Sequence, residues 1–579
     1  MLDKRWKIKP SIDDFEIRSL ADSLNISEVL AKLLVLRDVK TFSQAKKFFR
    51  PSIDTLYDPF KMNGMDLATT RVIEALTNNE KIMVYGDYDV DGTCSTALMY
   101  MFLKELGADV DYYIPSRLKE GYGISEAGID YAKSINTSLM ISVDCGITEV
   151  NETDYAKKLG IDLIICDHHQ AKEILPNAYA VLDPIKPECN YPFKFLSGAG
   201  VAFKLAQGIS ERIGRRELPL KYLDLVALAG AADIVPIIDE NRVLVTEGLK
   251  LINENPRPGV KALIKSSHMS VGNLSSVQIV FTLAPRINAV GRLSDAKIAV
   301  ELMTTQDENR AIELASVLES ENFERRKIDE DTLNEAIQKV NSTINFDEDL
   351  AIVLHGENWH PGVIGIVASR LVEKFYRPTI MLTTIDGVAK GSARSISNFN
   401  IYEALKECED MLLHFGGHEA AAGLAVEVDN FENFKEYFNK VVKEKISHGD
   451  LLPEIEIDSK VKFSDFTPKF LRIVNQFAPF GPGNMRPTFL AEGVEVSNHP
   501  RIVGNNHLLM SVKQKGCDKV FDAIGFDLGN FLPKVIVPKV VFDMVFSVDQ
   551  MSRDGKSFPQ LKIKDIKIID DSNLSQNVN

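Results

Sequence analysis

Three aspartates, Asp87, Asp89 and Asp91, lie at alternate positions in the segment Gly-Asp-Tyr-Asp-Val-Asp-Gly. An apolar run at residues 81–85 precedes them and a helix-forming run at residues 95–103 follows, so this order predicts a strand, an acidic loop and a helix. In a parallel α/β sheet, the loop that leaves the carboxyl end of a strand faces the ligand crevice. Carboxylates this close repel one another, and a bound divalent cation would neutralise them.

Two other interpretations of this loop are open. A solvated acidic turn would account for such a loop taken alone. Asp-x-Asp-x-Asp-Gly also opens an EF-hand, which needs a glutamate at its twelfth position and a helix before its first aspartate. Counted from Asp87, the twelfth position is Leu98, and the preceding run is typical of a strand, so the EF-hand is excluded. The choice between turn and metal site depends on the rest of the chain.

Potential metal ligands follow two further apolar runs. Residues 138–143 lead into Asp144, and residues 162–166 lead into Asp167, His168 and His169. Strands of one parallel sheet end at the same edge, so these side chains can converge with the first acidic loop.

Asp233 is a fourth candidate, because it ends an apolar, helix-like run and a buried aspartate needs a partner. Each candidate alone has a structural explanation: Asp144 as a helix cap, the two histidines as one core and one surface residue, and Asp233 in a salt bridge. Four coincident element ends favour one shared metal site.

The composition is that of an ordinary globular protein, with 45% apolar and 26% charged residues in 579 positions. No apolar run is long enough to span a bilayer and the first residues lack a signal-peptide core, so we expect a cytoplasmic protein without membrane contact. The six cysteines are scattered, which supports neither a disulfide framework nor a zinc ribbon. A net charge of −15 argues against a general nucleic-acid coat, although an acidic site loaded with metal and lined by arginines can hold a phosphodiester.

The pattern along the chain predicts an α/β protein with several domains. Strands and helices alternate in two regions, a charged helical pattern connects them, and short β-rich runs follow. The expected divisions are a helical segment at 1–50, a parallel-sheet domain at 51–295, a connecting helix at 296–345, a smaller α/β domain at 346–450, an OB-like β-barrel that binds nucleic acid at 451–569, and a disordered tail at 570–579.

Two further segments suit contact with phosphate. Arg286 and Arg292 lie in a stretch punctuated by proline and glycine, which is predicted to be a loop, although two surface arginines explain it equally well. Gly416, Gly417 and His418 precede an alanine-rich run that is predicted to start a helix, and they offer backbone amides and an imidazole to an anion.

Taken in order, the acidic and histidine motifs resemble those of the DHH phosphoesterase superfamily: Asp89 with Asp91, Asp144, Asp-His-His at 167–169, and Asp233. Within it, Arg-x-x-Glu-Gly-Tyr-Gly at 117–123 and the downstream segments resemble the RecJ family of bacterial exonucleases specific for single-stranded DNA. The resemblance runs from about residue 50 to the carboxyl-terminal region, and it identifies 346–450 as similar to a DHHA1 domain.

This resemblance implies 5′ to 3′ hydrolysis of single-stranded DNA to 5′-mononucleotides, in DNA repair and recombination. It implies that His418 contacts a phosphate and that Arg117, Ser392 and Arg394 form a pocket for a 5′-terminal phosphate. Oxygen donors with one imidazole suit two Mn²⁺ or Mg²⁺ ions.

We expect Asp144 to bridge these ions, with Asp89 on one side and Asp91, His168 and Asp233 on the other. Asp87 is expected either to bind an ion or to orient a ligand, Asp167 to fix an imidazole beside it, and His169 to face the substrate.

Two alternatives of different kinds stay open: a phosphodiesterase of the same superfamily that cleaves short oligoribonucleotides or cyclic dinucleotides, and a non-catalytic DHH scaffold in replication. The length of the chain favours the exonuclease over the first, and the complete set of acids and histidines argues against the second. The expected partners of a monomeric exonuclease are single-stranded DNA, a single-strand-binding protein and a helicase.

Overall fold

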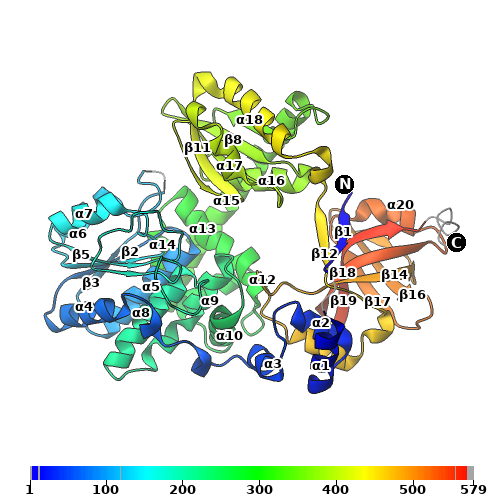
Figure 1. The fold of residues 1–579 in the computed structure, drawn as a ribbon, viewed down its shortest axis with the longest axis horizontal. Helices are drawn as coiled ribbons and strands as arrows, with labels where there is room; N and C mark the ends of the chain where they lie inside the picture. Colours follow the sequence, from blue (N-terminus) through cyan, green and yellow to red (C-terminus); the bar gives the residue numbers. More distant parts are fainter. Residues whose placement is uncertain (1–2, 11–12, 118, 554–555, 570–579) are drawn as a thin grey trace. The chain divides into compact units, whose positions relative to one another are not determined.

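The computed structural model describes residues 3–10, 13–117, 119–553 and 556–569. By their internal contacts they divide into two compact units (Figure 1). Unit 1 consists mainly of Leu56–Val235 and Leu244–Pro453, and unit 2 of Lys4–Thr55, Pro236–Val243 and the chain from Glu454 onward. The predicted tail at 570–579 lies outside the described residues.

The first domain of unit 1 is built on a five-stranded, wholly parallel sheet in the order β3-β2-β4-β5-β6. Its central strands are almost entirely buried, which explains their near-continuous apolar sequences. The strands are β2 (Ile82–Gly86), β3 (Val110–Tyr113), β4 (Leu139–Val143), β5 (Asp162–Cys166) and β6 (Ala180–Leu182). The helices of this region are α4 (Met65–Thr77), α5 (Val90–Glu105), α6 (Glu126–Ser134), α7 (Val150–Lys158), α8 (Gly198–Arg212), α9 (Leu223–Ala232), α10 (Asp239–Glu254) and α11 (Pro258–Ser266).

A second group of helices leads out of this domain. It comprises α12 (Ser276–Gln278), a π-helical turn η4 (Ile279–Leu283), α13 (Ala284–Leu293), α14 (Lys297–Thr304) and the 36-residue α15 (Glu308–Thr343). The sequence predicts a loop around Arg286, but the structure has helix there, because Pro285 lies in the first turn of α13, where its missing amide costs nothing. The expected connecting helix is α15, whose first turn is capped by the side chain of Asp307.

The second domain of unit 1 has a mixed five-stranded sheet in the order β10-β11-β9-β8-β7. Its elements are β7 (Ile352–Gly356), α16 (Ile364–Phe375), β8 (Thr379–Ile385), β9 (Val388–Arg394), α17 (Ile401–Lys406), β10 (His414–His418), β11 (Ala421–Glu427) and α18 (Phe431–Lys445). The predicted helix after His418 is wrong, since that segment is strand β11 and pairs with both β9 and β10. Alanine has the highest helix propensity, but propensity is a weak determinant of structure, and sheet pairing overrides it here.

Unit 2 contains a closed sheet, because strands β14-β18-β19-β17-β16 pair in order and β14 also pairs with β16. Its elements are β1 (Arg5–Ile8), α1 (Asp14–Leu24), α2 (Glu28–Val35), α3 (Phe42–Phe49), β12 (Glu454–Ile457), β13 (Ser459–Lys460), α19 (Pro468–Asn475), β14 (Thr488–Val496), β15 (Arg501–Val503), β16 (His507–Gln514), β17 (Val520–Gly525), α20 (Leu532–Val535), β18 (Val541–Arg553) and β19 (Lys556–Ile568). A small closed sheet of five strands is typical of an OB-fold.

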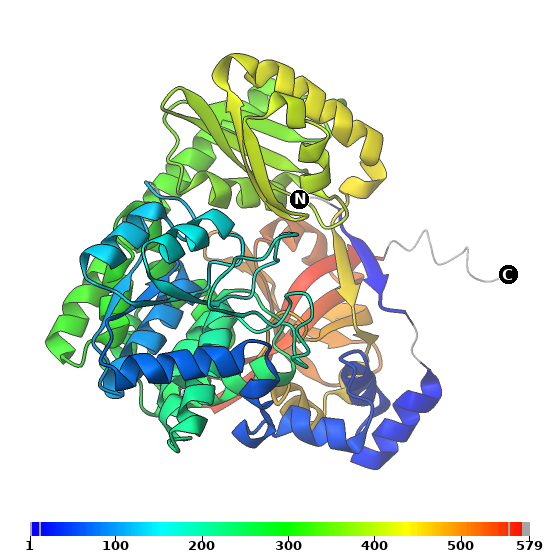
Figure 2. The ribbon, with the colours of Figure 1, turned by 60° about the vertical axis from the view of Figure 1, so that its left-hand side comes forward.

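The amino-terminal helices share the hydrophobic core of the closed sheet. Leu33 and Leu34 of α2 belong to the same buried cluster as Phe477, Phe489 and Phe546. Strand β1 pairs in parallel with β12, and Figures 1 and 2 show the two side by side. Residues 4–55 are therefore an integral part of the carboxyl-terminal unit.

None of the helices in the described ranges has both the length and the apolar character needed to cross a membrane. The predicted fold class is confirmed: a parallel-sheet domain, a mixed α/β domain, a long helix and a carboxyl-terminal β-rich domain.

Candidate metal centre and substrate site

Two aspartates of the first acidic loop lie at the amino end of helix α5. The side chain of Asp89 caps this helix and accepts a hydrogen bond from the Gly92 amide at 3.0 Å. Asp91 is buried, and its two carboxylate oxygens accept hydrogen bonds from the Gly198 and Ala199 amides at 2.6 and 2.7 Å. The amino end of α8 therefore fixes Asp91, as expected where a carboxylate meets a helix dipole.

Gly198 has a second role in the site, which the sequence alone did not reveal. A Cβ atom at this position would lie 2.5 Å from Oδ1 of Asp144, so no larger residue fits without displacing that carboxylate. The segment 197–200, Ser-Gly-Ala-Gly, contains no charged or histidine side chain, and its closeness to Asp144 becomes evident only in the folded chain.

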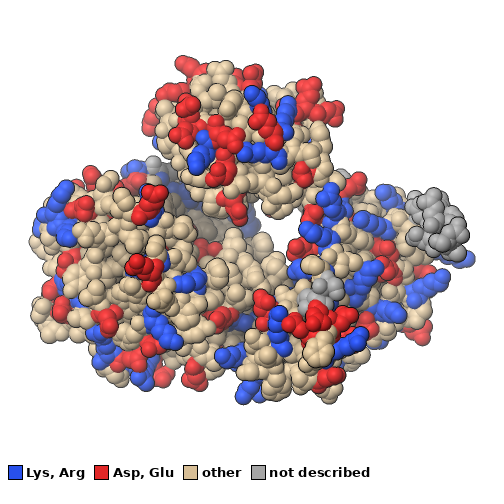
Figure 3. Space-filling view, viewed as in Figure 1, with Lys and Arg blue, Asp and Glu red and all other residues tan. Residues whose placement is uncertain are grey.

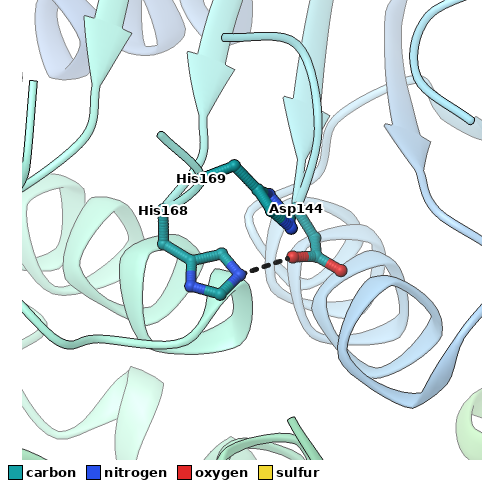
Figure 4. A group of neighbouring side chains, drawn as sticks. All are labelled: Asp144, His168 and His169. Carbon is teal, nitrogen blue, oxygen red and sulfur yellow. Dashed lines mark ion pairs between the residues drawn. The ribbon is translucent and has the colours of Figure 1, made fainter. Parts of the chain in front are cut away.

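Asp144 and His168 meet at the carboxyl ends of β4 and β5. Nε2 of His168 lies 3.2 Å from Oδ1 of Asp144 (Figure 4). It also lies 3.6 Å from Oδ2 of Asp233 and 3.9 Å from Oδ2 of Asp91. Burial lowers the pKa of His168 to about 4, so its imidazole is neutral and free to act as a ligand at neutral pH.

The backbone is unusual at Asp144 and at the residue that follows Asp233. Asp144 has φ of 63° and Ile234, which follows Asp233 at the end of α9, also has φ of 63°. A β-branched residue in this left-handed region is strained, and the side chain of Ile234 is 70% exposed, so core packing does not repay the strain. Such outliers concentrate at functional sites.

The candidate ligands form three overlapping groups whose ligand atoms lie within 4.8 Å of one another. The groups are Asp87, Asp89 and Asp144; Asp91, His168 and Asp233; and Asp144, His168 and His169. The third group shares Asp144 with the first and His168 with the second. The sequence-predicted set is thus brought together in one place, from the ends of β2, β4, β5 and α9.

Four buried atoms in this cluster have no hydrogen-bond partner: Oδ1 of Asp87, Oδ1 of Asp144, Nε2 of His168 and Oδ2 of Asp233. Buried polar atoms are nearly always paired, so four converging unpaired acceptors need an explanation, and a cation supplies one. Burial and the negative charge of the neighbouring aspartates raise the pKa of Asp91 to about 7 and raise those of Asp87, Asp144 and Asp233 well above their usual range. The donor set of carboxylates and one neutral imidazole fits divalent cations.

His169 differs from His168 in its environment. Its Nδ1 lies 2.7 Å from Oδ1 of Asp167, which also accepts the amide hydrogen of His168. Burial would lower the pKa of His169, but the bond to Asp167 and the surrounding carboxylates outweigh it and raise the value to about 9. Burial would likewise raise the pKa of Asp167, but the bond from His169 and the charges of both imidazoles outweigh it and lower the value to about 2. His169 is therefore a cation at neutral pH, and its side chain is 42% exposed.

Tyr122 also belongs to the site, although only Arg117 was selected from its motif. Its hydroxyl lies 3.0 Å from Nδ1 of His169 and donates a hydrogen bond to the backbone oxygen of Asp144 at 3.3 Å. The ring is 47% exposed, so it is accessible to a ligand at the metal cluster.

A cluster of arginines accompanies the acids. Burial lowers the pKa of Arg292 to about 10, and the positive charges of Arg117, Arg325 and Arg394 act in the same direction. Among the described residues, Arg117, Arg292 and Arg394 form no ion pair with a carboxylate within 4.0 Å. Arg325 is not among the predicted site residues, because it lies in a charge run at 324–327 that has the composition of a solvated helix face. The cluster thus has uncompensated positive charge.

Ser392 and Arg394 lie at the end of β9, where Nη1 of Arg394 donates to Oγ of Ser392 at 2.8 Å. Gly365 in the first turn of α16 leaves room for both, since a Cβ atom there would lie 2.9 Å from each of the two side chains.

The remaining predicted substrate residues are placed differently. Arg286 is buried and its guanidinium pairs with Glu319 of α15, so its charge is already compensated. Gly416, Gly417 and His418 form the exposed strand β10, and within the described chain no hydrogen bond or ion pair joins them to the acid cluster. Their contact with substrate stays a prediction.

The parallel sheet with acids and histidines at its strand ends, followed by a mixed α/β domain, defines a phosphoesterase of the DHH class. Residues 81–230 match the DHH family, N-terminal domain, residues 348–444 match the DHHA1 domain, and residues 457–565 match the RecJ OB domain. The chain belongs to the RecJ family of single-stranded-DNA-specific exonucleases, as the sequence motifs indicated.

Several relatives show this relationship. The chain is 40% identical over 567 residues to the single-stranded-DNA-specific exonuclease RecJ of Bacillus subtilis, covering 97% of this chain and 71% of the relative. It is 32% identical to RecJ of Escherichia coli, covering 89% of this chain and 92% of the relative. The crystal structure of Thermus thermophilus RecJ with Mn²⁺ is 29% identical, with a TM-score of 0.82 over 97% of this chain and 79% of that one, and its Mg²⁺ complex is 28% identical, with a TM-score of 0.77 over 97% and 78%.

Proposed function

We propose that this protein removes 5′-mononucleotides from single-stranded DNA in the 5′ to 3′ direction, with the help of two divalent cations, Mn²⁺ or Mg²⁺. The observation that carries the metal requirement is the convergence of four unpaired, buried ligand atoms from Asp87, Asp144, His168 and Asp233. Mn²⁺ and Mg²⁺ are the ions bound in the Thermus relative, and oxygen-rich donor sets suit both.

The grouping of the ligand atoms supports a division into two sites that share Asp144. Asp87, Asp89 and Asp144 would hold one ion, and Asp91, His168 and Asp233 the other, with Oδ1 of Asp144 only 3.2 Å from Nε2 of His168. When bound, such a pair of ions activates a water molecule and stabilises the charge that develops on the phosphate.

The chain itself contributes a positive group beside the ions. His169, held as an imidazolium by Asp167, would donate a hydrogen bond from its other ring nitrogen to a phosphate oxygen. Tyr122, whose hydroxyl lies 3.0 Å from Nδ1 of His169, would help to keep the imidazole in place. The hydrogen bond to Asp167 thus keeps His169 positively charged and in a fixed position, so the site has a cation here without a lysine or an arginine.

The arginine cluster supports hydrolysis that starts at the 5′ end of the strand. Arg117, Arg292 and Arg394, together with the Ser392 hydroxyl, would bind a 5′-terminal phosphate, because guanidinium groups match phosphate oxygens and these three have no carboxylate partner. A strand anchored by its 5′ end would present its first phosphodiester bond to the ions. Arg286 is a weaker candidate because Glu319 already neutralises it.

The two alternatives are less well supported. The match of residues 457–565 to an OB domain of exonucleases counts against an enzyme for dinucleotides, and the convergent ligands count against a non-catalytic scaffold. A single-strand-binding protein and a helicase as partners, a monomeric state, and cytoplasmic action in DNA repair and recombination stay part of the proposal.

A single digestion experiment tests it. Single strands labelled at either end, and the matching duplex, are incubated with Mn²⁺, with Mg²⁺ or with chelator. We expect labelled mononucleotide from the 5′ end of the single strand in the presence of metal, with little product from the duplex. Release that begins at the 3′ end, or that persists in chelator, would contradict the proposal.

A further inference from the structure

Unit 2 contains a pocket of about 650 Å³ that no part of the proposed mechanism uses. It is bordered by β1, β12, the end of α2 and the segment that leads into β14. Lysine and arginine side chains gather over β1 and β12 on the face shown in Figure 3. Five cations line the pocket: Lys4, Lys9, Arg37, Arg486 and Lys564.

The three carboxylates that line the pocket are already engaged. Lys9 pairs with Asp458 at 2.9 Å and with Glu456 at 3.6 Å. Glu454 pairs, at 3.3 Å each, with two cations of β1 that lie outside the pocket lining. Lys9 is a single cation facing two of these acids, so part of the charge of Asp458 remains and also attracts Arg37 and Lys564.

The remaining cations are in surplus. Arg486 pairs with Asp549 at 3.1 Å. By contrast, Lys4, Arg37 and Lys564 have no carboxylate within 4.0 Å anywhere in the described ranges of the chain. With five cations and three carboxylates in its lining, the pocket has an excess of positive charge and favours an anion, and this holds although the chain as a whole has a net charge of −15.

Arg37 is held rigidly by neutral groups. It donates to Oδ1 of Asn484 at 2.8 Å and to the backbone oxygens of Leu33 and Met485 at 2.7 and 2.6 Å, and its guanidinium lies 5.1 Å from the centre of the Phe477 ring. These contacts fix the group without cancelling its charge, and two of its five N–H groups are left for a ligand. A guanidinium fixed in advance loses little side-chain entropy when it binds.

Lys564 is aimed at the pocket by an irregularity in the sheet. The pairing of β18 with β19 skips Lys564 between Ile563 and Asp565, which makes it the extra residue of a β-bulge. Bulges of this kind redirect a side chain. The amine donates to Oγ1 of Thr488 at 2.9 Å and so has two further hydrogens to offer. Desolvation lowers the pKa of Lys564.

We propose that this pocket binds a backbone phosphate of single-stranded DNA between Arg37 and Lys564. The half-exposed ring of Phe526, which also lines the pocket, would stack on a neighbouring base. The inference rests on the proposed single-stranded substrate, and it assigns the contact of the carboxyl-terminal unit with that strand to named residues. The proposed ligand is a phosphodiester of the strand. A free phosphate compound has the same chemistry, and the experiment distinguishes the two.

The test measures binding of the whole chain to a fluorescent thymidine 30-mer by anisotropy, with chelator present to prevent hydrolysis, at several salt concentrations. Lys564→Gln should weaken binding about threefold to tenfold and reduce the slope of log affinity against log salt by about 0.7, the value for one phosphate contact on a single strand. Lys564→Arg should restore binding to within about twofold of the wild type, because it keeps the charge.

Lys460→Gln is the matched control. Lys460 lies in the same unit, pairs with Glu492 on the surface and does not line the pocket, so its removal changes the net charge equally. Equal binding by Lys564→Gln and Lys460→Gln would overturn the inference.

A second arm separates the two sources of phosphate. If inorganic phosphate or thymidine monophosphate raised the Tm of the wild type and not of Lys564→Gln, while both bound the 30-mer equally, the pocket would be a site for free phosphate compounds and the inference would be wrong. A wild-type protein that neither binds the 30-mer nor degrades it with Mn²⁺ would refute the proposed function and this inference together.

Discussion

The buried Nε2 atom of His168 lies 3.2 Å from the buried Oδ1 atom of Asp144, and neither has a hydrogen-bond partner. Burial lowers the pKa of the imidazole and raises that of the carboxylic acid, so the two do not form a stable ion pair. An ionised carboxylate and a neutral imidazole nitrogen this close would both be acceptors and would repel each other, so without a cation the pair must bind a proton. A cation and a proton therefore compete for this place, which leads to testable consequences.

Asp144→Asn should abolish hydrolysis of single-stranded DNA, by roughly a thousandfold or more, because the shared ligand is lost. In chelator, the same change should leave Tm unchanged or raise it, since it removes a buried carboxylate that has no cation beside it under these conditions. Asp154→Ala, at an exposed position in the same domain, is the control and should retain activity. An Asp144→Asn protein that is fully active would disprove the metal assignment.

The pH dependence of stability should be inverted in the metal-free protein. Asp91, with a folded pKa of about 7, and His169, with about 9, both bind protons more tightly in the folded state than in the unfolded one. Their contribution to the free energy of unfolding is complete at low pH and is lost as pH rises through these values. We expect a loss of about 2 kcal/mol between pH 6 and 8, most of it from Asp91, because solvent screens the 42% exposed side chain of His169 and the low pKa of His168 acts in the opposite direction. The low pKa of Asp167, about 2, acts only below pH 4 and so lies outside this window.

Calorimetry in chelator at several pH values measures this slope. Mn²⁺ should raise Tm more at pH 8 than at pH 6, since protons compete with the ion at the lower pH. A chelated protein that becomes more stable from pH 6 to 8 would contradict the grouping of these acids.

Asp167→Asn should lower the pKa of His169 toward that of a free histidine, because the bond that holds the imidazolium is lost. Activity above pH 7 should then fall about tenfold or more relative to activity at pH 6, while the wild type loses activity only near pH 9. A pH–rate profile of kcat measures the change, and an unaltered alkaline limb would show that His169 does not act as a cation.

Substitution of Arg394 should change substrate preference, whereas substitution of Arg286 should change stability. Arg394→Ala should reduce the preference for a 5′-phosphorylated strand at least tenfold in kcat/KM with little change in Tm, because its guanidinium has no carboxylate partner. Arg286→Ala should instead cost about 3 kcal/mol of stability, since it leaves Glu319 without its partner. An unchanged preference in Arg394→Ala would place the 5′-phosphate pocket elsewhere.

Ile234→Asn should stabilise the chelated protein by about 1 kcal/mol, since asparagine tolerates the left-handed backbone after a helix and the isoleucine side chain is exposed. Ile213→Asn is the control, because Ile213 follows helix α8 with φ of −91° and gains nothing from the change. Thermal unfolding compares the two, and a less stable Ile234→Asn protein would mean that this side chain packs against something.

The acids of the site could be predicted because they follow apolar strands, and parallel strands must end at one edge. Gly198 and Ala199 could not, since their contribution is a pair of backbone amides and an absent Cβ, which no side-chain motif encodes. Arg325 was hidden in a charge run that has the composition of a solvated helix face. The segment after His418 was predicted as helix from its alanines, whereas it pairs with β10 directly before it and with β9, which lies 27 to 39 positions earlier.

The pairing of β1 with β12 has a consequence for how the chain is made. Arg5 lies opposite Glu454, 449 positions further along the chain, so β1 is synthesised long before the strand with which it pairs. At translation rates of about 5–20 residues per second, this interval is on the order of tens of seconds. During that time the helices at 14–49 have no completed core to cover, and a nascent chain would be exposed there to chaperones and proteases.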